Sequence, residues 1–450
     1  MSENRGNFSG KIGFILAAAG SAVGLGNIWR FPYLAAEYGG GIFLLVYIVL
    51  ALTFGFALMT AEIALGRKTG LSVVGAFSKL NKKFAFIGYL AAIVPMIILP
   101  YYSVIGGWVI KYAKEFILGN VADTVKSDYF TGFITGDVEP VGWFLLFIAL
   151  TAIVVLFGVQ KGVERVSKFL MPVLVILSLF IAVYGLFLPG AIEGVKYYFI
   201  PKFNQFSVKT VLAALGQLFY SMSLAMGIMI TYGSYMKKDV SIESSVKSIE
   251  IFDTGIAFLA GLMIIPGVFA LGNPATDLQS GPSLMFVTLP KIFDAMPAGR
   301  FIGIAFFAMV FLAAITSSIS LMETVVSIVC DKLHIKRKTC CIFVFVGSVL
   351  IGLPSCLGYG VWGSVEIIGM QFLDFFDFIS NSVIMPIVAL LTCIFVGYVI
   401  KTKTLTDEIE LSGPFKRKSL FNVMIKYIAP ICIVLILLTS VLGAFGIFTI

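Results

Sequence analysis

Charged side chains are scarce in this sequence of 450 residues, in which Asp, Glu, Lys and Arg together make up 12% and hydrophobic residues 59%. A water-soluble fold could not bury so much apolar surface, so the chain must use lipid as its solvent. Apolar stretches of about 20 residues or more recur along nearly the whole length. They indicate helical membrane spans, because the strands of an outer-membrane barrel would show alternation over about ten residues.

Motifs typical of enzymes, metal sites and nucleic-acid-binding proteins are also lacking. The single histidine, His334, falls in a basic loop where we expect it to be solvated, and the six cysteines show no CxxC spacing. The sequence contains no HExxH and no GxxxxGK[ST], and no strand precedes the glycines at Gly24 and Gly26 as a dinucleotide-binding loop would require. There is no basic stripe with interleaved aromatic residues. We therefore expect neither an enzyme nor a nucleic-acid partner.

The apolar stretches predict eleven membrane-spanning helices within one transmembrane domain that covers residues 1–450. The first stretch follows a short polar segment without a cleavage site, so we expect it to be retained and not removed as a signal peptide. The predicted spans are about 12–35, 40–66, 84–114, 142–159, 166–187, 208–235, 250–272, 299–330, 339–358, 372–400 and 421–447.

Basic residues gather in alternate loops between these spans, at 67–83, 161–168, 237–247, 332–338 and 401–418. By the positive-inside rule these loops are cytoplasmic. The sequence therefore predicts a multi-pass protein of the cell inner (plasma) membrane, with its N-terminus in the cytoplasm and its C-terminus outside. This topology also accounts for the net charge of +8.

Two predicted spans, the first and the sixth, are interrupted by residues that disfavour a continuous apolar helix. The first contains GSAVGLGN (Gly20–Asn27) and the sixth contains YSMSLAMG (Tyr220–Gly227). Unwound backbone in hydrocarbon costs several kcal/mol for each unpaired group, so such breaks persist where they line a cavity. Breaks five spans apart are typical of transporters built from inverted repeats. Close helix packing through Gly20 and Gly24 is the alternative explanation for the first motif.

Three motifs carry a resemblance to a known family: GSAVGLGNIWRFP (Gly20–Pro32), GQLFYSMSLAMG (Gly216–Gly227) and TSSIS (Thr316–Ser320). With them the whole chain resembles the neurotransmitter:sodium symporter family, and its eleven spans resemble the bacterial branch. The resemblance implies an all-α integral membrane fold of two inverted five-helix repeats, at about 10–190 and 205–402, with broken helices 1 and 6 and an extra helix at about 421–447.

The resemblance also implies a sodium-coupled symporter that imports amino acids, hydrophobic or aromatic ones, by alternating access. An ion channel and a sodium-coupled transporter of another small organic solute remain the alternatives. A channel would be expected to show a continuous polar pore, whereas the polar residues here concentrate at two breaks.

By the same resemblance, two sodium ions would bind beside the breaks. Sodium is a hard cation that prefers several oxygen ligands, which unwound carbonyls and hydroxyls supply. One site would use Ala22, Asn27, Ser221 and Asp253, and the other would use Gly20, Val23, Ala313, Thr316 and Ser317. Hydroxyl residues of this kind also join helices to each other, which is the alternative reading of Ser221, Thr316 and Ser317.

The family's substrate contacts correspond to Ala22, Gly26, Tyr102, Tyr220, Ser221, Ser223, Met226, Ser317 and Leu321. Met226 stands where many relatives have phenylalanine, and its flexible thioether suits large side chains. Two charged pairs resemble the family's gates, Arg30 with Asp377 outside and Arg5 with Asp331 inside. Asp374 is an alternative partner for Arg30, one helical turn before Asp377.

Two further features follow from the resemblance. Relatives that need chloride have asparagine where this sequence has Asp253, so we expect a chloride-independent transporter whose carboxylate balances the sodium charge. A position for Asp253 near the cytoplasmic interface, where water would solvate it, is the alternative. Gly162 and Pro172 resemble a motif at which the cytoplasmic end of span five unwinds to release sodium.

Overall fold

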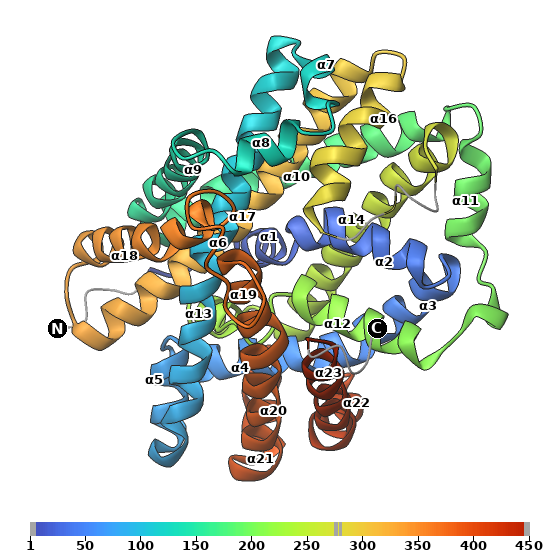
Figure 1. The fold of residues 1–450 in the computed structure, drawn as a ribbon. Helices are drawn as coiled ribbons and strands as arrows, with labels where there is room; N and C mark the ends of the chain where they lie inside the picture. Colours follow the sequence, from blue (N-terminus) through green and yellow to red (C-terminus); the bar gives the residue numbers. More distant parts are fainter. Residues whose placement is uncertain (1–5, 274–277, 279–280, 445–450) are drawn as a thin grey trace.

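The computed structural model describes residues 6–273, 278 and 281–444 (Figure 1). Within these ranges the protein is helical and has no β-strand, only two isolated β-bridges. Nine of the described helices are long and apolar enough to cross a membrane, or ten if one bent pair is counted as a span. The all-α membrane fold that the sequence predicts is thereby confirmed.

Five of the eleven predicted spans combine α-helical segments with short π-helical segments. The label η marks π-helical segments and also the two 3₁₀-helical segments η3 and η5. The first five predicted spans comprise α1 (Lys11–Ala22), η1 (Gly26–Arg30) and α2 (Phe31–Glu37); α3 (Gly41–Leu50), η2 (Ala51–Gly55) and α4 (Phe56–Thr69); α6 (Ala85–Leu118); α9 (Glu139–Leu156); and η4 (Val159–Glu164) with α10 (Arg165–Leu186).

The remaining predicted spans correspond to α12 (Val208–Ser221) and α13 (Ile228–Ser234); α14 (Ile242–Leu271); α17 (Gly299–Leu333); α18 (Arg337–Leu357); α19 (Phe372–Asp377), η7 (Phe378–Ile384), α20 (Met385–Ile394) and η8 (Phe395–Val399); and α22 (Lys418–Val423), η9 (Met424–Ile428) and α23 (Ala429–Ala444).

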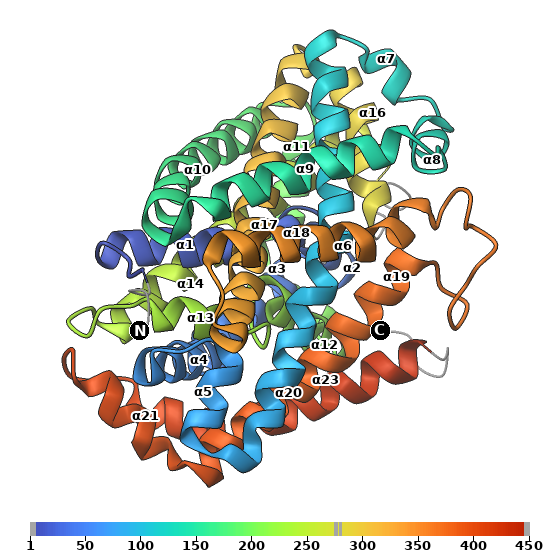
Figure 2. The same cartoon turned by 90° about the vertical axis from the view of Figure 1, so that its left-hand side faces the viewer.

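Short helices in the connecting segments were not predicted from the sequence. Figure 2 shows two of them, α8 at the right of the view and α21 at the opposite side. The additional short helices are α5 (Val73–Leu80), η3 (Lys82–Phe84), α7 (Val121–Thr124), α8 (Tyr129–Ile134), α11 (Ala191–Phe199), η5 (Phe203–Gln205), η6 (Leu284–Thr288), α16 (Leu289–Ala295) and α21 (Lys401–Glu410).

The seventh span begins earlier than the sequence predicts. Helix α14 starts at Ile242 and not near residue 250, because Ser241 caps it by accepting a hydrogen bond from the Ser244 amide. The extra turns carry Asp253 away from the helix end, and its side chain is fully buried. The alternative of a solvated interfacial Asp253 is therefore wrong.

The broken first span lies at the centre of the molecule and packs against α10, α14 and α17 (Figure 1). The peripheral helices instead expose large apolar side chains: Phe169 and Ile176 on α10 are 70% and 64% exposed, and Leu350 on α18 is 63% exposed. In water such surfaces would drive aggregation, whereas lipid tails solvate them. The fold thus presents an apolar outer surface to the lipid.

Helices α4 and α13 touch backbone to backbone. A Cβ at Gly66 would overlap the carbonyl oxygen of Ile230, and a Cβ at Gly233 would overlap that of Ile63. Glycine at both positions therefore allows the two helices to approach closely. The contact fixes the second half of the broken sixth span against α4.

Candidate functional site

The break in the first span is a bend of 55° between Lys11–Ala22 and Gly26–Glu37. The helix ends at Ala22, and Val23 adopts an extended conformation. Side chains satisfy the backbone groups that the bend frees: Gln217 donates to the Gly26 carbonyl at 2.9 Å, and Asn27 accepts from the Gly24 amide at 3.0 Å. The break that GSAVGLGN predicts is confirmed, and it is satisfied by hydrogen bonds, as buried polar groups must be.

The sixth span is interrupted between Ser221 and Ile228, as its polar stretch predicts. Ser223, Ala225 and Gly227 all have left-handed backbone, at φ 53°, 58° and 72°, a conformation that costs roughly 1 kcal/mol for a residue with a side chain. The Ala225 amide donates to buried Glu62 at 2.7 Å. Sequence reasoning missed Glu62, although a lone carboxylate within an apolar span was the available signal.

A cavity lies between the two breaks, and all nine residues predicted to contact substrate line it. Its free volume is about 30 Å³, room for roughly two water molecules. The structure adds lining residues that the sequence did not single out for substrate: Ser21, Gly24, Leu25, Asn27, Ile98 and Ile228.

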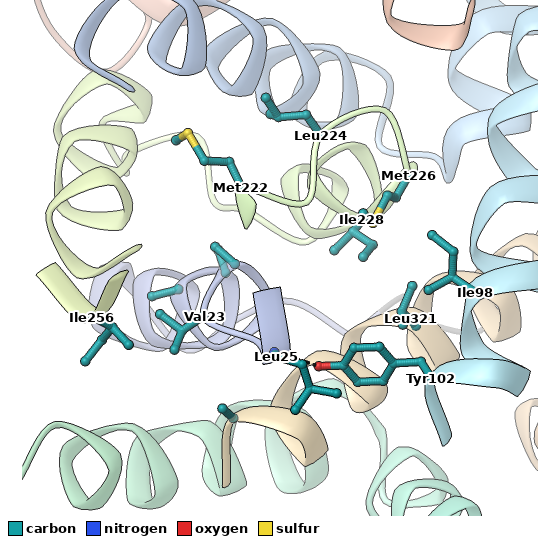
Figure 3. Packing of buried hydrophobic residues seen from close by; sticks show 14 of the residues in the cluster. Val23, Leu25, Ile98, Tyr102, Met222, Leu224, Met226, Ile228, Ile256 and Leu321 are labelled. Atoms are coloured by element: carbon teal, nitrogen blue, oxygen red, sulfur yellow. Dashed lines mark hydrogen bonds between the residues drawn. The ribbon is translucent and has the colours of Figure 1, made fainter. Parts of the chain in front are cut away.

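One end of the cavity is apolar and the other is polar. Figure 3 shows the side chains of Ile98, Met226, Ile228 and Leu321 gathered around a common space, and the Tyr102 hydroxyl directed at Leu25. The Leu25 amide donates to that hydroxyl at 3.3 Å. Such a division suits a ligand that has a polar head and an apolar side chain.

Glycines bring the polar end of the cavity close to its aromatic and hydroxyl residues. A Cβ at Gly24 would lie 2.9 Å from the Ser317 hydroxyl oxygen, and a Cβ at Gly26 would lie 2.5 Å from the Tyr220 ring. Both distances are too short for a real side chain, so the close approach requires glycine.

The first predicted sodium cluster surrounds a buried carboxylate. Asn27 and Ser221 donate to Asp253 Oδ1, each at 2.7 Å, and the Tyr47 hydroxyl lies 3.3 Å from Oδ2. Asp253 makes no ion pair with a described lysine or arginine, so its hydrogen-bond partners are all neutral. A buried carboxylate of this kind is costly unless a cation compensates it, so these residues fit a sodium ion. Tyr47 is an addition that the sequence analysis missed.

The second predicted cluster joins α1 to α17. The Ser317 hydroxyl lies 3.3, 3.1 and 3.2 Å from the carbonyl oxygens of Gly20, Ser21 and Val23. Thr316 lies beside it and bonds to the Ala313 carbonyl at 3.1 Å. The five residues predicted for this site therefore lie close together, and they contribute carbonyl and hydroxyl oxygen atoms. Such oxygen atoms suit a hard monovalent cation.

Comparison with known proteins agrees with this geometry. The model of the sodium:neurotransmitter symporter family matches residues 5–129 and 134–445. The chain belongs to this family. YhdH, a sodium-dependent transporter of Bacillus subtilis described as uncharacterized, is 35% identical over 98% of this chain and 99% of its own. The human sodium- and chloride-dependent GABA transporter 2 is 28% identical over 90% of this chain and 75% of its own.

Among solved structures, this symporter resembles that of MhsT in complex with L-phenylalanine. The TM-score is 0.87 at 39% sequence identity, and the match covers 97% of this chain and 100% of that one. Its family and the sodium-dependent transporters among its relatives identify the protein as a sodium-dependent transporter, as the sequence motifs predict.

On one side of the symporter's cavity, the predicted outer gate residues lie near each other. Arg30 interacts electrostatically with Asp377 without forming a direct ion pair, and its guanidinium carbon lies 5.5 Å from the Tyr220 ring centroid. Asp377 accepts hydrogen bonds from Tyr101 at 3.0 Å and Asn381 at 2.6 Å. The alternative partner, Asp374, is exposed and bonds to Tyr359 instead.

On the opposite side, Arg5 lies outside the described residues. Its predicted partner, Asp331, accepts a hydrogen bond from the Ser72 amide at 2.9 Å. Phe8 makes edge-to-face contacts with Phe14, Tyr232 and Tyr235.

Sequence analysis also missed an ion pair around a buried carboxylate, Glu323, at this end. Tyr235 donates to Glu323 at 2.9 Å, and Arg337 binds the same carboxylate through both terminal nitrogens. The contact joins α17 to α18 beside the predicted inner gate.

Proposed function

We propose that this symporter imports hydrophobic amino acids, aromatic ones included, together with sodium and by alternating access. The observation that carries the proposal is the cavity between the two breaks, polar at one end and lined at the other by Ile98, Met226, Ile228 and Leu321. The similarity to MhsT in complex with L-phenylalanine supports the same substrate class.

The amino acid's carboxylate would bind at the polar end. The amides near Gly26 begin the second half of the broken helix, where the helix dipole favours a negative charge, and the Tyr102 hydroxyl would donate to it. The ammonium would meet carbonyl oxygens of the unwound sixth span. The cavity's small free volume means that a phenylalanine side chain enters only if the apolar residues, Met226 among them, change position.

Two sodium ions would occupy the clusters around Asp253 and Ser317. An ion that enters down a tenfold gradient and across about 100 mV releases about 3.7 kcal/mol. Two ions therefore release about 7 kcal/mol, enough to concentrate a neutral zwitterion roughly 10⁵-fold. Because the Asp253 carboxylate supplies the balancing negative charge, transport would not require chloride.

The proposed topology has eleven spans. Helices α12 and α13, which flank Met222–Gly227, would form the sixth span, so that two inverted five-helix repeats place the breaks of spans one and six opposite each other. The basic loops would face the cytoplasm of the inner membrane. Arg30 and Asp377 would close the outer side, and Arg5 and Asp331 the inner side.

Uptake into proteoliposomes tests this function. We expect electrogenic accumulation of phenylalanine or leucine that requires an inward sodium gradient and persists when gluconate replaces chloride. A panel of amino acids in competition would rank the substrates. Sodium current without solute would favour a channel, and accumulation of a solute other than an amino acid would refute the proposed substrate class.

A further inference from the structure

The segment before the first span, residues 7–9, is tied to the beginning of span five. The Ser9 amide donates to Glu164 Oε2 at 2.8 Å, and the Ser9 hydroxyl donates to Oε1. Gln160, one turn earlier, donates to the Asn7 carbonyl at 2.6 Å. Gln160 and Glu164 both belong to η4. This one short segment therefore binds both ends of residues 7–9, which we call the N-terminal strap.

Glu164 is built into this position and is not a surface residue that happens to be near. It is 2% exposed, and Lys168 donates to its Oε1 at 2.6 Å and to the Ser9 hydroxyl at 3.1 Å. Gly13 packs so closely against the carboxylate that a Cβ there would overlap it. Hydrogen bonds to an ionised group are roughly twice as strong as neutral ones, and Glu164 accepts two such bonds from Ser9. Lys237 adds one more charge-assisted bond, to the Ser9 carbonyl at 2.9 Å, but it does not connect the strap to η4.

The strap and η4 are both adjacent to the parts that must open for release to the cytoplasm. The Phe8 amide donates to the Tyr235 carbonyl at 3.1 Å, which places the strap over the end of span six. Segment η4 contains Gly162 and continues directly into α10, which contains Pro172. Pro172 removes one helical hydrogen bond near the beginning of α10, which weakens the helix at the end of span five that adjoins η4.

We propose that Glu164 is a positioning residue that couples two movements, the departure of the N-terminal strap and the unwinding of span five, so that they occur together. While the carboxylate holds both Ser9 donors, the strap cannot leave without pulling on η4, and η4 cannot unwind without losing the strap. This inference rests on the proposed alternating access, and it adds a single residue through which the two inward-opening movements are coupled.

Hydrogen–deuterium exchange of the intact protein in lipid nanodiscs, at saturating sodium, tests the coupling without any transport measurement. In Glu164→Gln, the amides of residues 6–14 and 159–170 should both exchange about tenfold faster, because each weakened charge-assisted bond lowers local stability. Glu193→Gln is the matched control, since Glu193 also pairs with a lysine on its own helix, Lys196, at 3.0 Å, but is exposed. It should change neither segment.

Two more variants keep the test decisive if Glu164→Gln does not fold. Ser9→Ala removes one donor, and Gly13→Ala displaces the carboxylate while keeping its charge; each should accelerate both segments together. The double variant Ser9→Ala with Glu164→Gln should show less than the sum of the two single effects.

Acceleration confined to residues 6–14 would overturn the proposal, because the strap would then leave without affecting span five. Unchanged exchange in all folded variants would overturn it as well. Failure of wild-type uptake would instead refute the proposed transport function, so the two ideas fail in distinguishable ways.

Discussion

The replacement Asp253→Asn tests how the symporter balances the charge of bound sodium. The wild-type carboxylate is fully buried and surrounded by the neutral donors Asn27, Ser221 and Tyr47. Removing one member of a buried charge pair typically costs 3–5 kcal/mol. Asparagine keeps an oxygen ligand that Ser221 can still reach, so we expect the lower end, about 3 kcal/mol, which corresponds to roughly a 100-fold loss of sodium affinity.

Sodium titrations of substrate binding, run in chloride and in gluconate, measure this loss. The wild type should show the same sodium affinity in both media, whereas the variant should be about 100-fold weaker in gluconate and partly restored by chloride. Asp123→Asn is a suitable control, because Asp123 pairs with Lys126 at 2.7 Å on the exposed surface. A strong chloride requirement in the wild type, or unchanged sodium affinity in Asp253→Asn, would refute the reasoning.

Three further predictions concern the pocket and the gates. Met226→Phe should disfavour tryptophan more than leucine by about tenfold in competition uptake, since overpacking costs 1–3 kcal/mol and penalises the larger ligand first; an unchanged ranking would contradict this. Arg30→Ala should slow outward closure, measured as faster substrate dissociation, and exchange of Arg30 with Asp377 should recover part of it; recovery by exchange with Asp374 instead would identify the other carboxylate as the partner. Pro172→Ala should slow release to the cytoplasm several-fold while equilibrium sodium binding is kept, and normal turnover would indicate a static kink.

The sequence predicted the parts of the fold that depend on composition along one segment. Long apolar runs give spans wherever lipid is the solvent, and the glycines of Gly20–Asn27 and the polar run Tyr220–Gly227 located both breaks to within a few residues. The start of α14 was missed because five of the eight residues before position 250 are polar, although Ser241 is a typical helix cap. Short connecting helices such as α11 carry no span-length signal, so tertiary packing decides them.

The candidate site was predicted mainly through the family resemblance, and its missing members share a physical cause. Tyr47, Ile98 and Glu62 lie on continuous helices away from the breaks, where a single side chain gives no pattern in the sequence. Only the fold shows that Tyr47 reaches Asp253 and that Glu62 reaches the unwound sixth span. Ionisable or hydroxyl groups inside a span need partners. Such a residue is therefore a candidate site residue even when its partner cannot be named from the sequence.

The glycine contact between α4 and α13 determines which elements can travel together. The backbone of Gly66 packs directly on that of Ile230, and the backbone of Gly233 on that of Ile63. Because these contacts are close-packed, α4 and α13 cannot slide along each other. Any change of direction within span six must then be absorbed at Met222–Gly227, whose left-handed residues already depart from helical geometry. A pair of spin labels on α4 and α13 would consequently keep a constant separation throughout the transport cycle and supply the fixed frame against which the other helices' displacements are measured.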